Sequence, residues 1–308
     1  MCTPDHGTCR RLAADSVAWP TMRDHLVWRL PALTPQRIDE MIAEGRFVTS
    51  DGTPIDAHTP FRAQTFVFFH RDLPDETPVP HPIGILGLDE RILVVDKPHF
   101  LSSIPRGRHV VESVVVRLRT QLGMPELTVA HRLDRVTAGV LLLTRSRQWR
   151  RPYQELFERR QVTKTYRAIA RHVDLTAVDA PGVRHLPDEP DGPWVEVTSR
   201  IVKERGVLQA REVEGPVNAR TRVRVLARRG DLALYEARPL TGRTHQVRLH
   251  LQRLGAPILD DPFYPRLLDV DIADFSAPLQ LQAHPLAFTD PVDGTRRSFT
   301  SRLPLARW

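Results

Sequence analysis

The sequence predicts an α+β fold: a mixed, mostly antiparallel central sheet with flanking helices, preceded by a small N-terminal α/β module. Two observations favour this class. Short apolar or alternating runs, typical of strands, recur from residue 84 onwards, and only a few segments between them have helical periodicity. A proline-rich stretch separates this part from the first quarter of the chain.

Four parts of the chain follow from this pattern. We predict a flexible tail over 1–18, a small module over 19–73, a linker over 74–83 and a large domain over 84–308. The linker is semi-rigid by composition, because four prolines stand among acidic residues in PDETPVPHP. A chain of 308 residues is long enough for one large and one small domain.

The composition is that of a basic globular protein. The formal net charge is +7, and all but three of the 44 basic residues are arginines. Arginine forms bidentate phosphate contacts and stacks on bases, so this bias favours a polyanionic partner such as nucleic acid. Genome composition alone can also produce it.

Cysteine content and hydropathy exclude other classes. Cys2 and Cys9, the two cysteines, are too few and too close for a disulfide framework or a zinc site, which fits a reducing cytoplasm. No apolar run approaches the roughly 18 residues of a membrane span, and the N-terminus lacks a signal-peptide pattern. We therefore expect a cytoplasmic, soluble monomer with no membrane contact.

The small module is predicted to begin with two helices. Leu26, Leu30 and Leu33 mark the first, which Pro31 interrupts, and Thr34-Pro35 is typical of the N-cap and first turn of the second. An Asp-Gly turn then predicts a hairpin, and a last strand runs over 65–69.

In the large domain, continuous apolar runs predict buried strands and mixed patterns predict amphipathic helices. We expect strands over 92–95, 140–144, 162–170, 194–202, 219–227, 232–239 and 281–285, helices over 110–122 and 148–160, and a loop over 179–193.

Asp134 is the first candidate for chemistry. It stands between Arg132 and Arg135, directly before a buried strand, and nearby positive charge favours the ionised carboxylate. A carboxylate at such a strand–loop junction is a candidate nucleophile or general base. The alternative, a surface ion pair beside a core strand, is open on these residues alone.

The second candidate is the stretch TGRTHQVRLHL, a glycine turn that leads into a helix ending at Leu254. Arg243, His245, Arg248 and His250 surround its start. A solvated basic helix is one interpretation. A two-histidine metal site is another, but metals usually take a carboxylate or cysteine as well, and none is adjacent, so no metal is predicted.

Four motifs in order carry a resemblance to a known family. HRLDRVTAGVLLL resembles the signature H-R-L-D-x-x-T-S-G-L/V of the RluA-type pseudouridine synthases. ILVVDKPHFLSSIP, TGRTHQVRLHL with the following PILDDPFY, and LQAHP are similar to further segments of that family, so that the resemblance covers about residues 88–304. The N-terminal module loosely resembles the alpha-L RNA-binding motif.

This resemblance implies the pseudouridine synthase fold and isomerisation of uridine to pseudouridine in rRNA or tRNA, without a cofactor. It implies that Asp134 is catalytic, that Arg248 pairs with it, and that Tyr166 stacks on the target base, although a strand tyrosine is more often simply half buried. Arg132 would fill the gap that the flipped base leaves. The remaining RNA-binding or base-flipping candidates are His131, Arg135, Lys164 and Arg243.

Two positions depart from the family pattern. Ala138 replaces a serine, which puts one local hydrogen bond in doubt, and Asp260 replaces a glycine, which makes the following loop harder to predict. Two other functions stay open. One is a catalytically inactive RNA-binding or ribosome-assembly protein with the same fold. The other is a glycosidase, which would normally need a second catalytic carboxylate.

Overall fold

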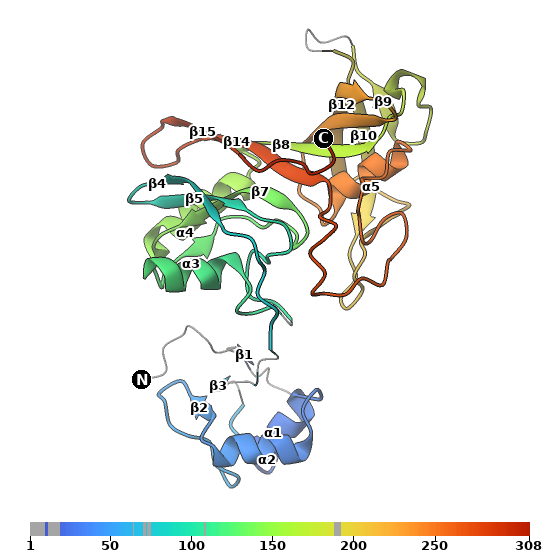
Figure 1. Cartoon of the computed structure of the whole chain (residues 1–308). Coiled ribbons are helices and arrows are strands. Elements are labelled where there is room, and N and C mark those ends of the chain that lie inside the picture. The colour runs from blue at the N-terminus through green and yellow to red at the C-terminus, as the bar shows by residue number, and fades with distance from the viewer. Residues whose placement is uncertain are drawn as a thin grey trace. The chain divides into compact units, whose positions relative to one another are not determined.

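The computed structural model divides into two compact units, one that ends at Asp75 and one over Glu76–Trp308 (Figure 1). Each unit has its own hydrophobic core. The structure describes residues 10–11, 19–63, 65–69, 72, 75–107, 109–187 and 192–308. Most of the expected tail, part of the expected linker and part of the 179–193 loop lie outside these residues.

The first unit packs two helices against a small sheet. Ile38, Met41 and Phe47 are fully buried between them. Thr34 Oγ1 accepts a hydrogen bond from the Arg37 N–H (3.1 Å), the N-cap that the sequence predicts. The elements are α1 (Met22–Arg29), α2 (Pro35–Ala43) and a sheet in the order β1 (Arg10–Arg11), β3 (Phe66–Phe69), β2 (Phe47–Thr49).

The second unit is organised around a twelve-stranded sheet. Its strands are β4 (Gly84–Leu88), β5 (Ile92–Lys97), β6 (Thr128–Val129), β7 (Ala138–Thr144), β8 (Val162–Arg171), β9 (Val183–His185), β10 (Val195–Val202), β11 (Arg211–Val213), β12 (Ala219–Arg229), β13 (Leu232–Pro239), β14 (Leu281–Thr289) and β15 (Arg296–Thr300). The helices are α3 (Val114–Leu122), α4 (Arg147–Glu158), α5 (Gln246–Arg253) and the single 3₁₀ turn η1 (Leu175–Ala177).

The strand order is β11-β10-β12-β13-β8-β14-β7-β5-β4, with β6, β9 and β15 paired alongside. Only β7 and β14 run parallel, and the other described pairs are antiparallel. The prediction of a mixed, mostly antiparallel sheet with flanking helices is confirmed.

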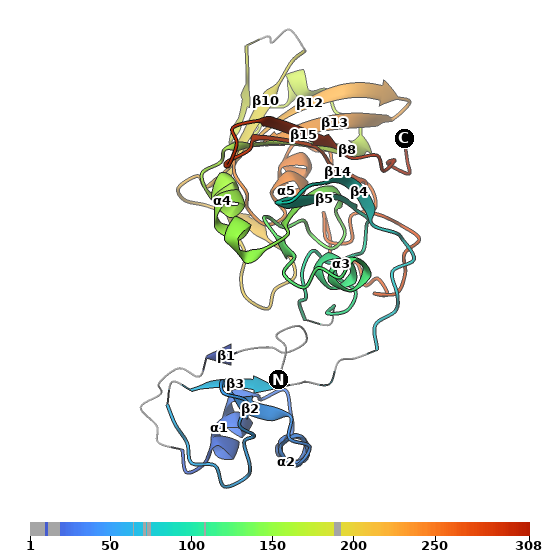
Figure 2. The ribbon, with the colours of Figure 1, turned by 90° about the vertical axis from the view of Figure 1, so that its left-hand side faces the viewer.

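Helices cover the two halves of this sheet differently (Figures 1 and 2). In the half that contains β5 and β7, alternate residues face opposite sides: Leu93 and Leu141 pack with α3, whereas Ile92 and Val140 pack with α4. This double burial explains the continuous apolar runs of both strands. In the other half, α5 packs through Val247 and its neighbours against β8 and β13.

Gly139 fixes the junction between the two halves. It pairs with Ala283 where β7 and β14 run in parallel, and its φ is +112°. A Cβ at this position would lie 2.0 Å from the carbonyl oxygen of Ala283. The close approach of the two strands therefore requires the glycine of the HRLDRVTAGVLLL motif.

Several elements differ from the sequence-based expectation. The helix expected from residue 110 begins at Val114, because the carboxylate of Glu76 holds the backbone N–H groups of residues 110–112 in a loop, and Ser113 caps the helix. The expected loop over 179–193 contains the short strand β9, and β15 was not expected. Both are short strands with mostly exposed side chains.

In the described residues, no helix is both long and apolar enough to cross a bilayer.

Candidate active site

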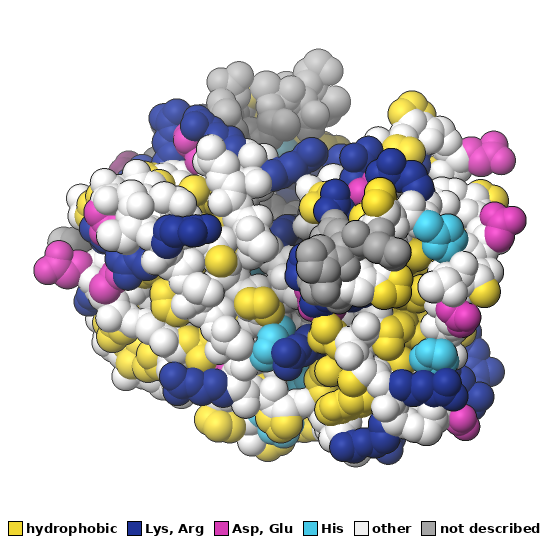
Figure 3. Space-filling model, turned by 90° about the horizontal axis from the view of Figure 1, so that it is seen from above, with side chains coloured by type: hydrophobic (Ala, Val, Ile, Leu, Met, Phe, Trp, Pro, Cys, Tyr) yellow, Lys and Arg dark blue, Asp and Glu magenta, His cyan; other side chains and the backbone are white. Residues whose placement is uncertain are grey.

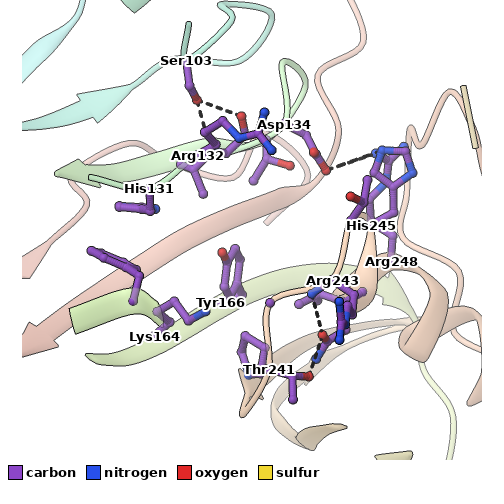
Figure 4. Close-up of a pocket in the computed structure, with 18 of the residues that line it drawn as sticks. Ser103, His131, Arg132, Asp134, Lys164, Tyr166, Thr241, Arg243, His245 and Arg248 are labelled. Atoms are coloured by element: carbon purple, nitrogen blue, oxygen red, sulfur yellow. Dashed lines mark hydrogen bonds and ion pairs between the residues drawn. The ribbon is translucent and has the colours of Figure 1, made fainter. Parts of the chain in front are cut away.

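Asp134 lies in the turn between β6 and β7, on the wall of a cavity of about 930 Å³ (Figure 4). The turn is closed by a hydrogen bond from the Thr137 N–H to the Asp134 carbonyl (3.1 Å). The carboxylate is 34% exposed, so it is open to a bound molecule and yet partly shielded from water.

The end of β5 and the segment after it hold this turn in place. Ser103 Oγ donates to the carbonyl of Leu133 (2.8 Å) and accepts from its N–H (3.0 Å). The Lys97 ammonium donates to the carbonyl of Arg135 (3.1 Å), and Nδ1 of His99 is hydrogen-bonded to the carbonyl of Val136 (2.8 Å). The sequence assigned this segment only to a strand and its loop, so these supporting roles were missed.

Lys97 is completely buried, although it carries the charged group among these contacts. Burial lowers the pKa of its ammonium to about 7, which the negative charge of Asp134 partly opposes and the positive charge of Arg135 reinforces. Its other two hydrogen bonds go to the carbonyls of Pro98 and Leu101. The ammonium thus links three carbonyls around the Asp134 turn.

The start of α5 is built by Gln246. Its Oε1 accepts from the Thr241 hydroxyl (2.8 Å) and from the Arg243 N–H (3.0 Å), and its Nε2 donates to the carbonyl of Arg220 (2.9 Å). These bonds fix the glycine turn before the helix. As a result, the side chain of Arg248, within the first turn of α5, points toward Asp134 (Figure 4).

Arg248 is 1% exposed, so α5 is not a solvated basic helix. Its guanidinium forms a two-pronged contact with Asp261, Nε to Oδ2 at 2.8 Å and Nη2 to Oδ1 at 2.5 Å. Nη1 lies 3.6 Å from Asp134 Oδ2 and has no hydrogen-bond partner among the described residues. Arg248 therefore faces Asp134, as expected, but its strongest partner is one that the sequence reasoning did not assign.

Two carboxylates keep Arg248 charged. Burial alone would lower the pKa of its guanidinium, but the hydrogen bonds and charge of Asp261, helped by Asp134, outweigh this and raise it. Asp261 is itself fully buried and accepts from the N–H groups of Phe263 and Tyr264. The guanidinium is thus held in one orientation.

Asp260 and Ala138, the two positions that depart from the family pattern, each have a defined place in the structure. Asp260 has a φ of +56°, in the left-handed region where glycine is usual and aspartate is among the better tolerated alternatives. Its carboxylate accepts from Arg307 Nε (3.1 Å). Ala138 is fully buried at the start of β7, where it pairs with Gln282.

Tyr166 and Lys164 reach the cavity from β8, on the side opposite Arg248 (Figure 4). The Tyr166 ring is partly exposed. Burial and then the charge of Asp134 raise the pKa of its hydroxyl, so it stays protonated. Burial, reinforced by the charge of Arg160, lowers the pKa of the Lys164 ammonium.

The other predicted residues also line the cavity but differ in their contacts. Arg132 and Arg243 are exposed, and Arg243 Nε donates to the carbonyl of Asn218 (3.3 Å). His131 stacks on Phe157 and accepts from a backbone N–H of β7, and burial, reinforced by the charge of Lys164, lowers its pKa to about 3. Arg135 donates to the carbonyl of Ile272 (2.7 Å), which anchors it to a neighbouring loop.

The cavity is strongly cationic and has no metal-like donor set. Its lining holds two carboxylates, Asp134 and Glu158, against eight basic side chains: Arg106, Arg132, Arg135, Arg160, Lys164, Arg238, Arg243 and Arg248. No three His, Cys, Asp or Glu side chains in the described part of the chain are gathered as a metal would need. His250, the second histidine of the alternative metal-site interpretation, is fully buried and hydrogen-bonded to Ser199 and Thr221.

Comparison with known proteins gives consistent matches. A family model described as "RNA pseudouridylate synthase" matches residues 91–253. The mitochondrial tRNA pseudouridine(32) synthase of Saccharomyces cerevisiae is 30% identical over 63% of this chain, which spans 39% of that protein. The dual-specificity RNA pseudouridine synthase RluA of Yersinia pestis is 31% identical over 70% of this chain and 96% of its own length.

A solved structure described as human RNA pseudouridylate synthase domain containing 4 is also similar. It superposes with a TM-score of 0.52 at 29% identity, covering 72% of this chain and 88% of that one.

Proposed function

We propose that this chain, which belongs to the RNA pseudouridylate synthase family, isomerises uridine to pseudouridine in a structured RNA, in the tRNA or rRNA class. The observation that carries the proposal is the meeting of three side chains. Asp134, Tyr166 and Arg248 come from a turn, a strand and a helix that are far apart in the sequence, and all three line one cationic cavity.

The reaction breaks the bond from the ribose to nitrogen 1 of uracil and joins carbon 5 of the same base to the same sugar carbon. There is no net redox change, so the protein needs to supply only binding, orientation and charge. A stacked base is out of reach, so the nucleotide must first be flipped into the cavity, at a cost of a few kcal/mol.

Asp134 would act at the sugar, either as a nucleophile at the anomeric carbon or as a base toward the neighbouring carbon. Both routes require an ionised carboxylate. Charge that develops on the sugar is stabilised by such a group in a shielded site. Arg248 supports it, because Asp261 fixes the guanidinium and leaves Nη1 directed at Asp134 Oδ2.

The remaining side chains fit binding of the flipped base and its strand. Tyr166 offers an aromatic face, which contributes roughly 1–3 kcal/mol per stacked base. Arg132 is exposed at the rim and is suited to occupy the vacated position in the RNA. The hydrogen bonds of His131 and Arg135 favour a supporting role in the cavity wall over direct RNA binding, whereas Lys164 and Arg243, which line the cavity, would meet phosphate or base atoms.

Phosphates would be held mainly around the cavity. Figure 3 shows basic side chains distributed over one face of the molecule. On α4, by contrast, Arg151 and Arg159 both pair with Glu155, although both are largely exposed. Because exposed ion pairs are weak, the two arginines remain available to a polyanion at little cost in free energy.

The N-terminal unit is proposed as an accessory RNA-binding module, but two of its helix arginines lie among carboxylates that reduce the local positive charge. Arg37 contacts Glu40, Glu44 and Asp72, and Arg23 contacts Asp39. We expect this unit to contribute less to phosphate binding than the cavity does.

We also propose that the protein works as a monomer in the cytoplasm. The few cysteines fit a reducing compartment. Light scattering of the purified protein with and without RNA, and fractionation of cells, test the two statements. A stable dimer, or enrichment in an organelle, would contradict them.

The test of the proposed function is Asp134→Asn. Asparagine keeps the size of the side chain but can be neither a nucleophile nor a base here. We expect tritium release from carbon-5-labelled uridine RNA to be abolished, while RNA binding, measured in parallel, persists. Appreciable turnover by the Asn variant would refute the role of Asp134. A wild-type protein that binds RNA but releases no tritium would favour the alternative, an inactive RNA-binding or ribosome-assembly protein.

A further inference from the structure

We propose that His245 is a positioning residue for this reaction: its neutral imidazole directs Nε2–H at Oδ2 of Asp134 and thereby turns Oδ1 toward the sugar. The inference rests on the proposed function and adds a residue to its site. Three observations carry it: the place of His245 in the backbone, the contacts of its Nδ1, and the atom that its Nε2 faces.

His245 occupies a constrained backbone position. It precedes the first residue of α5 and has a φ of +57°, which non-glycine residues rarely adopt. Its side chain is 6% exposed and lines the cavity beside Asp134 (Figure 4). A backbone held in this region is found where the surrounding structure, often a functional site, determines it.

The Nδ1 side of the ring sets the tautomer. The N–H of Ala210, which can only donate, points at Nδ1 (3.4 Å). The Tyr264 hydroxyl lies 2.8 Å from Nδ1 and donates to the carbonyl of Ala210 (2.7 Å). Because an amide N–H faces Nδ1 and a carboxylate faces Nε2, the surroundings favour the tautomer with the ring proton on Nε2.

The Nε2 side faces the reactive carboxylate. Nε2 lies 3.8 Å from Asp134 Oδ2, the same oxygen that Arg248 Nη1 approaches at 3.6 Å. These distances are longer than hydrogen bonds, as catalytic contacts often are before a substrate binds. No hydrogen bond to Oδ1 is found among the described residues. Because both N–H groups lie on the Oδ2 side, Oδ1 is the oxygen left free to meet the sugar.

The imidazole is neutral under ordinary conditions. Burial lowers its pKa to about 4, against the opposing influence of Asp134. A neutral donor orients the carboxylate without neutralising it, which complements the charge of Arg248. The charged and titratable groups around the ring are Asp134, Lys203, Arg248, Asp261 and Tyr264.

Two substitutions separate positioning from mere support. In His245→Asn, the amide oxygen reaches about as far as Nδ1, so it can keep the Ala210 contact, and asparagine tolerates a positive φ. The Nε2 donor is lost. In His245→Gln, the longer side chain can place an N–H near the position of Nε2. His185→Asn is the matched control, because this histidine is exposed and lies outside the cavity lining.

We expect His245→Asn to lower the single-turnover rate constant about 10- to 100-fold, since a misplaced reacting group costs up to about that factor. The Kd for RNA and the unfolding midpoint should stay close to wild type. His245→Gln should recover part of the rate, and the control should retain all of it.

A wild-type rate in His245→Asn would overturn the inference while leaving the proposed function intact. The inference would also be overturned if the Asn and Gln variants lost the same fraction of the rate and both had a lower unfolding midpoint, since this would indicate that His245 only supports the structure. Absence of tritium release by the wild-type enzyme would instead refute the proposed function, and the inference would fall with it.

Discussion

At the scale of single residues, the site separates the tasks of its charged groups. Arg248 uses two of its nitrogens to hold Asp261 and leaves the third for Asp134. A buried guanidinium that is hydrogen-bonded to one carboxylate can also stabilise the negative charge of a second carboxylate that has to react. Removing one partner of such a buried pair is typically destabilising by about 3–5 kcal/mol, so substitutions here must be read together with stability.

Arg248→Ala should therefore lose activity and stability together, and regain part of its rate as the pH rises, because more Asp134 becomes ionised when its cation is absent. Arg248→Lys should keep more activity, since it retains the charge but not the two-pronged geometry. The measurement is the pH–rate profile under single-turnover conditions. Arg253→Ala is the control, as Arg253 lies on the same helix and pairs with Glu212 outside the cavity lining. A fully active Arg248→Ala would point to Arg243 instead.

At the scale of elements, the sequence was most informative where one strong pattern determines structure. The continuous apolar runs at 92–95 and 140–144 do form neighbouring strands, because both of their faces are buried. The N-cap of α2 was equally clear. Short exposed strands such as β9 and β15 carry no such pattern, since their pairing depends on a neighbouring strand and not on their own side chains.

Site residues divide in the same way. Asp134, Tyr166 and Arg248 could be predicted because motifs mark them, and the structure brings all three to one cavity. Asp261 contacts Arg248, His245 faces Asp134, and Lys97 donates to a carbonyl of the turn before β7. These contacts exist only in the folded chain, so the roles of the three residues could not be predicted from spacing. The glycine of the motif was visible in the sequence, but its reason, the proximity of β14, was not.

Gly139→Ala tests that proximity. A Cβ would collide with the Ala283 carbonyl, and φ is positive, so we expect a loss of about 2–4 kcal/mol in the free energy of unfolding. Gly230→Ala is the control, because Gly230 also has a positive φ (+58°) but no atom within 4 Å of its Cβ position. Urea unfolding of the two variants separates collision from strain. Equal losses in both would contradict the steric explanation.

At the scale of the whole molecule, the distribution of charge decides how RNA is held. The cavity lining carries a large excess of cations, whereas Arg23 and Arg37 of the N-terminal helices pair with carboxylates. The affinity for RNA should thus depend on salt mainly through the catalytic unit.

We expect the log–log plot of the binding constant against salt to fall with a slope of about −0.7 per phosphate contact. Arg160→Gln, at the cavity, should make the slope shallower by about that amount, whereas Arg37→Gln in the N-terminal unit should change it little. Filter binding at several salt concentrations measures this. Affinity that does not vary with salt would exclude a phosphate-led interface.

The most direct measurement is a map of pseudouridines in cellular RNA with and without the gene, followed by rescue with the wild-type protein or with Asp134→Asn. The account predicts that at least one uridine in tRNA or rRNA loses its modification in the deletion strain, that the wild-type protein restores it, and that the Asn variant does not. An unchanged map, or full restoration by Asp134→Asn, would contradict the central claim that this chain isomerises uridine through Asp134.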